Sequence, residues 1–210
     1  MINKRLISQI LAIIIILGGL IVMFGWFFDI PVLKSILPGQ VSMKFITALS
    51  FIASGIILLL LNKGTERKEI CNLVLVVLSF TLLLLMIIFF ISLMTGISTG
   101  IEDMLIKDEI SAIKTSIPGV PAIPTMICFI LVSIAGLLTI KNPKTNSPFY
   151  LGIVTLIISI ISIVGYITKT SLLYYEFQGY TPIAFNTAML FFLIGTCLIL
   201  IKSKDNQKER

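Results

Sequence analysis

Residues 38–55 read PGQVSMKFITALSFIASG, a Pro-Gly turn that leads directly into an apolar helix. Two further stretches follow the same plan: GVPAIPTMICFILVS at residues 119–133 and GYTPIAFNTAMLFFLIG at residues 179–195. In each, a glycine precedes a threonine, a phenylalanine follows four residues later, and a small residue follows four residues after that. The triplets are Thr47/Phe51/Gly55, Thr125/Phe129/Ser133 and Thr187/Phe191/Gly195. Because a spacing of four keeps side chains on one face of a helix, each triplet is expected to line one helix face.

The composition of the chain predicts an integral membrane protein. Hydrophobic residues make up 57% of the sequence and charged residues 12%, and the mean hydropathy is +1.09. In soluble domains about a quarter of the residues are charged. An apolar run of about 20 residues crosses a bilayer as a helix. Six runs qualify, so we expect an all-α fold with six transmembrane helices, at roughly 6–28, 45–61, 70–94, 121–140, 149–168 and 182–201.

The basic residues are distributed as expected for a membrane protein with both termini in the cytoplasm. In that orientation, the cytoplasmic segments hold 11 of the 16 basic residues and 4 of the 10 acidic residues. This is the positive-inside bias of proteins in the cell membrane. The formal net charge of +6 is then explained by orientation and by contact with anionic lipid heads. No nucleic-acid partner is expected.

The repeated stretch divides the single domain, residues 1–210, into three two-helix units at approximately 1–64, 65–144 and 145–210. Each unit has an outward helix, an outer loop and an inward helix that begins with the repeated stretch. The second outer loop is the longest and has isoleucines at a helical spacing: Ile106, Ile110, Ile113 and Ile117. This pattern predicts an amphipathic helix that either lies on the outer membrane surface or covers an opening between spans.

The residue types exclude several kinds of chemistry. The chain has no histidine, and its three cysteines, Cys71, Cys128 and Cys197, form no CxxC pair. We therefore expect no metal site, no cofactor and no disulfide framework, and the cysteines are interpreted as packing residues. No carboxylate falls within a predicted span, and no histidine is present to activate a serine or threonine, so no enzymatic activity is expected.

Three segments resemble the N-terminal six-span membrane domain of prokaryotic sensor histidine kinases and diguanylate cyclases. They read GWFFDIPVLKSILPGQVSMKFITALSF at 25–51, STGIEDMLIKDEISAIKTSIPG at 98–119 and YTPIAFNTAMLFFL at 180–193. In that family the inward helices tend to begin with Pro-Asn-Thr-Ala or His-Thr-Ala. Thr47, Thr125 and Thr187 match the threonine, and Asn186 matches the asparagine. The resemblance covers nearly the whole chain and implies a sensory input module, here free-standing and without an output domain.

The repeated triplets have two interpretations. In the first, they form helix-packing faces, with small residues that allow close backbone approach: Phe51, Gly55, Phe129, Ser133, Phe191 and Gly195. In the second, the outer ends of the three inward helices converge, and their positive dipole ends favour an anionic or carbonyl ligand. The residues expected around that ligand are Lys44, Thr47, Thr125, Asn186 and Thr187, with Trp26, Tyr166 and Tyr180 as aromatic walls.

Three functional hypotheses follow from the sequence. The first is a sensor-like module that binds a small or lipid-soluble ligand near its extracytoplasmic face and signals through a separate membrane or cytoplasmic protein. The second is a small transporter or channel, and the third is a structural or assembly component of a membrane complex. The bilayer is the one partner that all three share.

Overall fold

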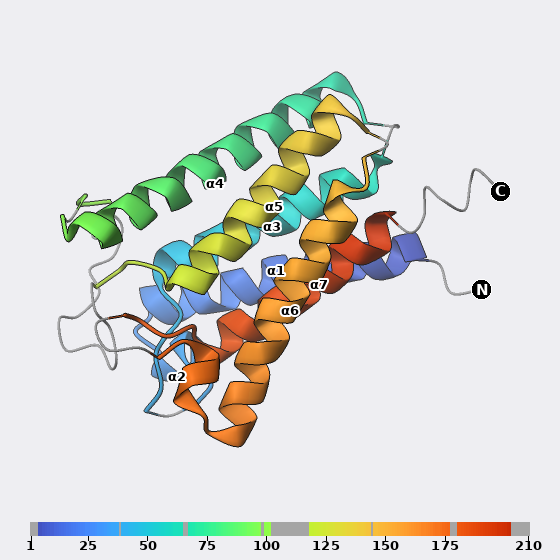
Figure 1. Ribbon diagram of the computed structural model, residues 1–210. Coiled ribbons are helices and arrows are strands. Elements are labelled where there is room, and N and C mark those ends of the chain that lie inside the picture. Colours follow the sequence, from blue (N-terminus) through green and yellow to red (C-terminus); the bar gives the residue numbers. More distant parts are fainter. Residues whose placement is uncertain are drawn as a thin grey trace.

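The computed structural model describes residues 4–37, 39–64, 67–97, 99–101, 118–143, 145–176 and 180–202. Within these ranges the chain is helical and contains no strand, which confirms the all-α class. The described residues form six long helices and two short ones (Figure 1). The elements are α1 (Lys4–Phe27), α2 (Pro31–Lys34), α3 (Phe45–Asn62), α4 (Glu69–Thr95), α5 (Ile123–Lys141), α6 (Ser147–Thr168), the 3₁₀ helix η2 (Ser171–Tyr174) and α7 (Phe185–Lys202).

The long helices coincide with the predicted apolar runs to within three residues at each end. Five of them, α1, α3, α4, α5 and α6, are long and apolar enough to cross a membrane, by length and composition. Helix α7 is also apolar, but its stretch Phe185–Ile201 is shorter. The predicted amphipathic helix at Ile106–Ile117 lies outside the described residues. So do Pro38 and Gly179 of the repeated stretches.

Three helices, α3, α5 and α7, form the centre of the bundle, and we call them the core helices. Each packs most extensively against the helix that precedes it, so α1 lies along α3, α4 along α5 and α6 along α7. Each of these peripheral helices also contacts a second core helix: α1 contacts α7, α4 contacts α3 and α6 contacts α5. The beginning of α1 and the end of α7 lie at one end of the bundle, and α2 lies at the other, which we call the α2 end (Figure 1).

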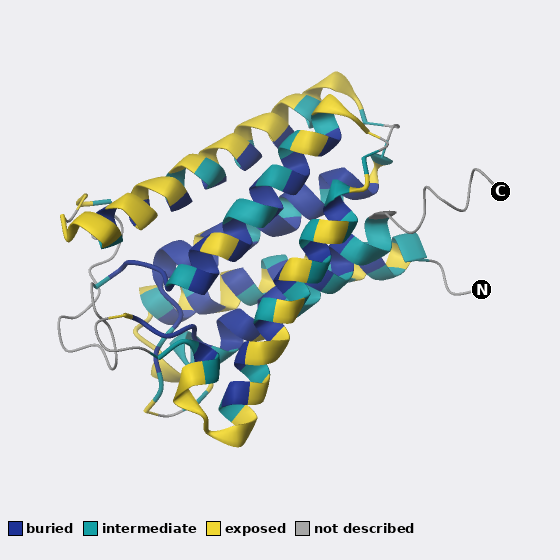
Figure 2. Cartoon of the chain, in the orientation of Figure 1, coloured by how far each residue is buried: buried dark blue, intermediate teal, exposed yellow. Residues whose placement is uncertain are grey.

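The surface of the peripheral helices is apolar. On α4, one stripe is buried, and the rest of the helix exposes large apolar side chains (Figure 2). The buried stripe consists of Leu75, Ser79, Leu82, Met86, Phe89 and Ser92. An exposed apolar surface of this extent is unfavourable in water and suits a lipid environment.

Three phenylalanines of the repeated triplets meet on the axis of the bundle. Phe51, Phe129 and Phe191 are all fully buried, and their ring centroids lie 4.9, 4.8 and 4.8 Å apart. Aromatic pairs at this spacing contribute about 0.5–1.5 kcal/mol each beyond the area they bury. The three rings therefore hold the core helices together.

Two of the three small residues of the triplets lie where a peripheral helix approaches a core helix closely. A Cβ on Gly55 would lie 2.9 Å from the carbonyl oxygen of Ala12 in α1. A Cβ on Gly195 would lie 2.9 Å from the carbonyl oxygen of Gly152 in α6. The third small residue, Ser133, is buried and donates a hydrogen bond to the carbonyl of Phe129 within α5.

The cysteines are free thiols, and Cys128 and Cys197 are fully buried among apolar side chains.

At the end of the bundle opposite α2, the Asn62 amide donates to the Ser8 hydroxyl at 2.6 Å. The Cys197 thiol lies 3.2 Å from the Ser8 carbonyl oxygen. These contacts join α1, α3 and α7.

Candidate ligand-binding site

Two aromatic side chains fix the backbone just ahead of core helices. The Trp26 indole at the end of α1 donates a hydrogen bond to the Met43 carbonyl, at 2.9 Å. The Tyr166 hydroxyl near the end of α6 donates to the Ile183 carbonyl, at 2.6 Å. Met43 and Ile183 each lie two residues before a core helix begins. The two bonds therefore set the paths by which the chain enters α3 and α7.

The loops after α1 and α6 have the same backbone geometry. Asp29 and Lys169 have φ angles of 50° and 55°, in the left-handed region. In the first loop, Ile30 N–H donates to the carbonyl of Gly25 at 2.8 Å, and in the second, Thr170 N–H donates to the carbonyl of Gly165 at 2.9 Å. These hydrogen bonds end α1 and α6 in the same way and turn the chain back over the α2 end.

The three core helices start in equivalent ways. The first intrahelical bonds run from the N–H groups of Ala48, Met126 and Ala188 to the carbonyls of Lys44, Ala122 and Ala184, each at 3.0 Å. Neither α3 nor α5 has a side-chain N-cap. Uncapped helix N-termini carry partial positive charge and favour anions.

A small polar cavity of about 10 Å³ lies where these three helix starts meet. This volume corresponds to room for about one water molecule. Its walls come from the residues just ahead of each core helix and from its first turn: Val41, Ser42, Met43, Lys44, Thr47, Pro121, Ala122, Thr125, Thr181, Pro182, Ala184 and Thr187.

Three threonines give the cavity its hydroxyl groups. Thr47, Thr125 and Thr187 are each 2% exposed, and one belongs to each core helix. All three line the cavity. A hydroxyl group can donate one hydrogen bond and accept others, so three of them around one cavity suit a polar occupant.

Lys44 adds positive charge to this wall. It is the residue directly ahead of α3, and its side chain is 3% exposed. Lys44 lines the cavity together with the first turns of α3, α5 and α7, whose N-termini favour negative charge.

The structure thus brings together four of the eight residues that the sequence predicts around a ligand: Lys44, Thr47, Thr125 and Thr187. Trp26 and Tyr166 do not line the cavity: Trp26 bonds to the wall residue Met43, and Tyr166 bonds to Ile183, which stands between two wall residues in the sequence. The Asn186 side chain points away from the cavity. Its amide donates to the Lys34 carbonyl at 3.1 Å, and its oxygen accepts from Thr187 N–H at 3.1 Å.

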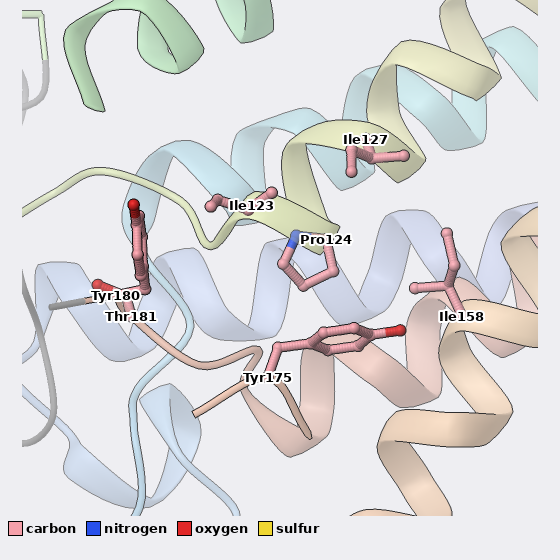
Figure 3. A pocket seen from close by; sticks show the side chains of 7 residues that line it. All are labelled: Ile123, Pro124, Ile127, Ile158, Tyr175, Tyr180 and Thr181. Atoms are coloured by element: carbon pink, nitrogen blue, oxygen red, sulfur yellow. The ribbon is translucent and has the colours of Figure 1, made fainter. Parts of the chain in front are cut away.

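Tyr180 lies instead on a second cavity, of about 210 Å³, between the start of α5 and the middle of α6 (Figure 3). The walls of this cavity are almost entirely apolar. They consist of Ile123, Pro124, Ile127, Ile158, Tyr175, Tyr180 and Thr181. Thr181 lines both cavities. The sequence gives no signal for the second cavity, because its walls come from three separate segments and share no motif.

Two titratable groups at the α2 end have shifted pKa values. The Asp29 carboxylate accepts a hydrogen bond from the Lys34 ammonium, and this bond, with the charge of Lys34, lowers the pKa of Asp29. The Lys34 ammonium also lies 4.6 Å from the centroid of the Trp26 ring. Burial raises the pKa of Tyr175, so its phenol is neutral at physiological pH.

Comparison with protein-family models, with curated proteins and with solved structures gave no match to this chain.

Proposed function

We propose that the chain is a six-span membrane input module that binds a small anionic group in the polar cavity and signals through a separate protein. The observation that carries this proposal is the set of three buried threonine hydroxyls, one from each core helix, around a cavity next to Lys44. Membrane embedding is supported by the five long apolar helices. Helix α7 has 18 residues, as α3 has, and it packs along α6, which supports a sixth span.

An origin from three two-helix units is supported by constant spacings. A shift of 140 residues takes Trp26, Met43, Thr47, Phe51 and Gly55 to Tyr166, Ile183, Thr187, Phe191 and Gly195. The same shift takes α2 onto η2. A shift of 78 residues takes Thr47 and Phe51 to Thr125 and Phe129. In such repeats a site at the junction of the units is common, and the polar cavity lies at this junction.

The proposed orientation places the α2 end outside the cell. Lys63, Arg67, Lys68 and Lys141 lie at or near the ends of helices on the opposite side, where the positive-inside bias places basic residues. The polar cavity is then near the extracytoplasmic face, and both termini are cytoplasmic.

The three phenylalanine rings favour an input module over a channel. They fill the axis of the bundle directly below the cavity, and all three are fully buried. An ion that enters the cavity from the α2 end therefore meets apolar rings instead of a polar path. A bound anion would instead pull on the starts of three helices at once and change their packing.

A signalling role sets a requirement on the energy of binding. A ligand that reverses a two-state equilibrium almost completely must favour one state by about 5.5 kcal/mol. Three hydroxyl contacts and one ammonium contact are enough for this if they form in one state only, because each hydrogen bond to a charged group contributes about 1.5–3 kcal/mol.

The proposal is tested with the purified protein in liposomes, by titration with sodium fluoride or sodium chloride, monatomic anions close to water in size, against sodium gluconate at equal ionic strength. Trp26 is the single tryptophan and bonds to Met43, a wall of the cavity, so its fluorescence reports occupancy. A saturating anion at 100 times its Kd should also stabilise the fold by about 2.7 kcal/mol.

Matched variants locate the binding site. Thr125→Val and Thr187→Val should abolish the fluorescence response, because valine keeps the shape and removes the hydroxyl. Thr196→Val is the control, since the Thr196 hydroxyl bonds within α7 to the Phe192 carbonyl. A response that persists in both cavity variants, or no response to either anion, contradicts the proposed site.

The signalling part has its own test. A histidine kinase or diguanylate cyclase that co-purifies with the chain from native membranes should change its activity with the anion, and Thr187→Val should remove that dependence. A partner whose activity is the same with and without the anion rules out this signalling role.

A further inference from the structure

We infer that the apolar cavity between α5 and α6 holds the hydrocarbon chain of a membrane lipid. This inference does not depend on the anion site. It rests on the proposed membrane embedding and on a difference between two otherwise similar helix contacts.

The contact of α6 with α5 has a counterpart in the contact of α1 with α7. The 140-residue shift takes Gly18 of α1 to Ile158 of α6, and the shifts of 140 and 78 residues together relate Asn186 of α7 to Pro124 of α5. Ile158 and Pro124 both line the apolar cavity. The contact between α1 and α7 therefore shows how the same positions pack when no cavity is left between the helices.

A hydrogen bond joins the start of α7 to α2, which packs against α1. The Asn186 amide donates to the Lys34 carbonyl in the first outer loop, at 3.1 Å. The residue that corresponds to Lys34 is Tyr174, whose carbonyl accepts from Ile183 N–H at 3.2 Å. Pro124 has no side-chain donor to offer this carbonyl, so the corresponding bond to α5 does not form.

Side-chain size also separates the two contacts. Space beside Gly18 is filled by Leu190, whose Cδ2 would lie 2.8 Å from a Cβ on that glycine. At the other contact, α6 has the larger Ile158, and the residue that corresponds to Leu190 is the smaller Cys128. Ile158 lines the apolar cavity, whereas the space beside its counterpart Gly18 is occupied by Leu190.

The chemistry of the walls selects an apolar occupant. Isoleucines and a proline form the α5 and α6 sides, and the Tyr175 ring lies beneath Pro124 with its hydroxyl directed toward Ile158 (Figure 3). The volume of about 210 Å³ exceeds the roughly 150 Å³ of an apolar cavity that binds benzene. A hydrocarbon segment fits such a space, whereas a charged ligand would lose its hydration without compensation.

The position of the cavity selects a lipid as the source of that hydrocarbon. Ile127 is both a wall of the cavity and an exposed residue of α5. On α6, the neighbouring Ile157 and Ile161 are exposed as well. The cavity is thus continuous with the apolar surface that faces the bilayer, and an acyl chain reaches it without leaving the hydrocarbon region.

The apolar and polar cavities share a wall, so a lipid in the apolar cavity contacts segments that also line the polar one. Thr181 lines both cavities, and Pro124 lines the apolar one while its neighbour Thr125 lines the polar one. A chain seated against Pro124 and Thr181 therefore contacts the same segments that a bound anion would move.

The test uses the full-length protein in phosphatidylcholine vesicles that contain a phosphatidylcholine with a diazirine on one acyl chain. After irradiation, labelled residues are located by mass spectrometry. Labelling at the α5–α6 cavity should exceed labelling at the α1–α7 contact by about tenfold, the ratio that a preference of about 1.4 kcal/mol gives.

Equivalent positions on the core helices provide matched variants. Leu49, Ile127 and Met189 have exposed fractions of 38%, 39% and 40%, but only Ile127 lines the apolar cavity. Ile127→Trp should remove the labelling of Tyr175 and Ile158, whereas Leu49→Trp and Met189→Trp should leave it unchanged. Tyr175→Ala, which enlarges the cavity, should increase labelling of Ile158.

Two results would overturn the inference. One is labelling spread evenly over both helix contacts in the unmodified protein, which would show ordinary lipid around the bundle. The other is labelling of Tyr175 that a folded Ile127→Trp variant retains. The comparison in the unmodified protein decides the question even if Ile127→Trp does not fold. Neither result bears on the anion site, which is tested by Trp26 fluorescence.

Discussion

The hydroxyl of Tyr166 makes one of the shortest hydrogen bonds to a loop carbonyl in the described chain, at 2.6 Å to Ile183. Tyr166→Phe removes this donor without changing the ring. The free energy of unfolding should fall by about 1–3 kcal/mol, because the Ile183 carbonyl loses its side-chain donor. Denaturant unfolding in detergent micelles measures the change.

The control for this substitution is Tyr150→Phe. Tyr150 is 62% exposed and faces the surroundings of α6. Its loss of a hydroxyl should change stability by less than about 0.5 kcal/mol. Equal effects of the two substitutions would mean that the bond to Ile183 contributes nothing.

Asp29 should show an acid transition. Its pKa in the folded protein is lowered by Lys34 from the ordinary 3.8. A depressed pKa means that the carboxylate contributes stability above pH 3.8 and that this contribution is lost as the pH falls through the lower folded value. Protonation also releases Lys34 from Asp29, so the Trp26 fluorescence should change in the same range.

Asp29→Asn should abolish this acid change in fluorescence, because the amide carries no charge at any pH. The Asp29 side chain is 88% exposed, so the contribution of this ion pair to overall stability should be small. A transition that survives in Asp29→Asn would assign the pH dependence to another group.

Helix α7 depends on a glycine to approach α6. A Cβ on Gly195 would lie 2.8 Å from the Leu156 nitrogen and 2.9 Å from the Gly152 carbonyl oxygen, both of them backbone atoms. Gly195→Ala should therefore force the helices apart and cost about 1–3 kcal/mol. Thermal unfolding of the protein in detergent measures the loss.

Ser133→Ala is the matched control on α5. Ser133 occupies the same place in its triplet, but its hydroxyl bonds only within the helix, to the Phe129 carbonyl. Its removal should cost less than Gly195→Ala. The opposite order would show that the close approach of α6 and α7 is not what Gly195 provides.

The helices and the three threonines are the features that sequence reasoning predicts well. Apolar runs end at Pro, Gly and charged residues, so the bounds of α1 and α4 follow directly from composition. Thr47, Thr125 and Thr187 share a spacing, and equal spacing puts them at equal depth. Side-chain contacts between distant segments are not predicted in this way. Asn186 bonds to Lys34 across 152 residues, and the repeated pattern alone does not distinguish that contact from one with the cavity.

The apolar cavity shows the same limit more clearly. Two of its wall residues, Pro124 and Ile158, stand where the other units have Asn186 and Gly18. The repeated sequence pattern is defined by the residues that the units share, so it gives no weight to positions where they differ. Only the packed helices reveal which departures leave a space.

At the scale of the whole molecule, the number of spans decides where the C-terminus lies. Six spans place both termini on the cytoplasmic side, whereas five place them on opposite sides. A variant without Cys71, Cys128 and Cys197 but with Lys169→Cys should react with an impermeant maleimide added to intact cells. Asn142→Cys in the same background should react only after the membrane is opened.

A cysteine at the C-terminus completes this experiment. Six spans predict that it behaves like Asn142→Cys. Reaction in intact cells would show that α7 does not cross the membrane and would contradict the proposed architecture.

The contact between α1 and α7 has a consequence for how the protein is made. During synthesis α1 is made before α7. The side of α1 that packs against α7 therefore stays uncovered until α7 has been made. Until then Ser8 has no contact with Cys197, and the Lys34 carbonyl has no contact with Asn186. Before α7 is made, the helices form an incomplete ring, and the contact between α1 and α7 closes that ring. A chain that is interrupted before α7 therefore leaves the α7-facing side of α1 uncovered.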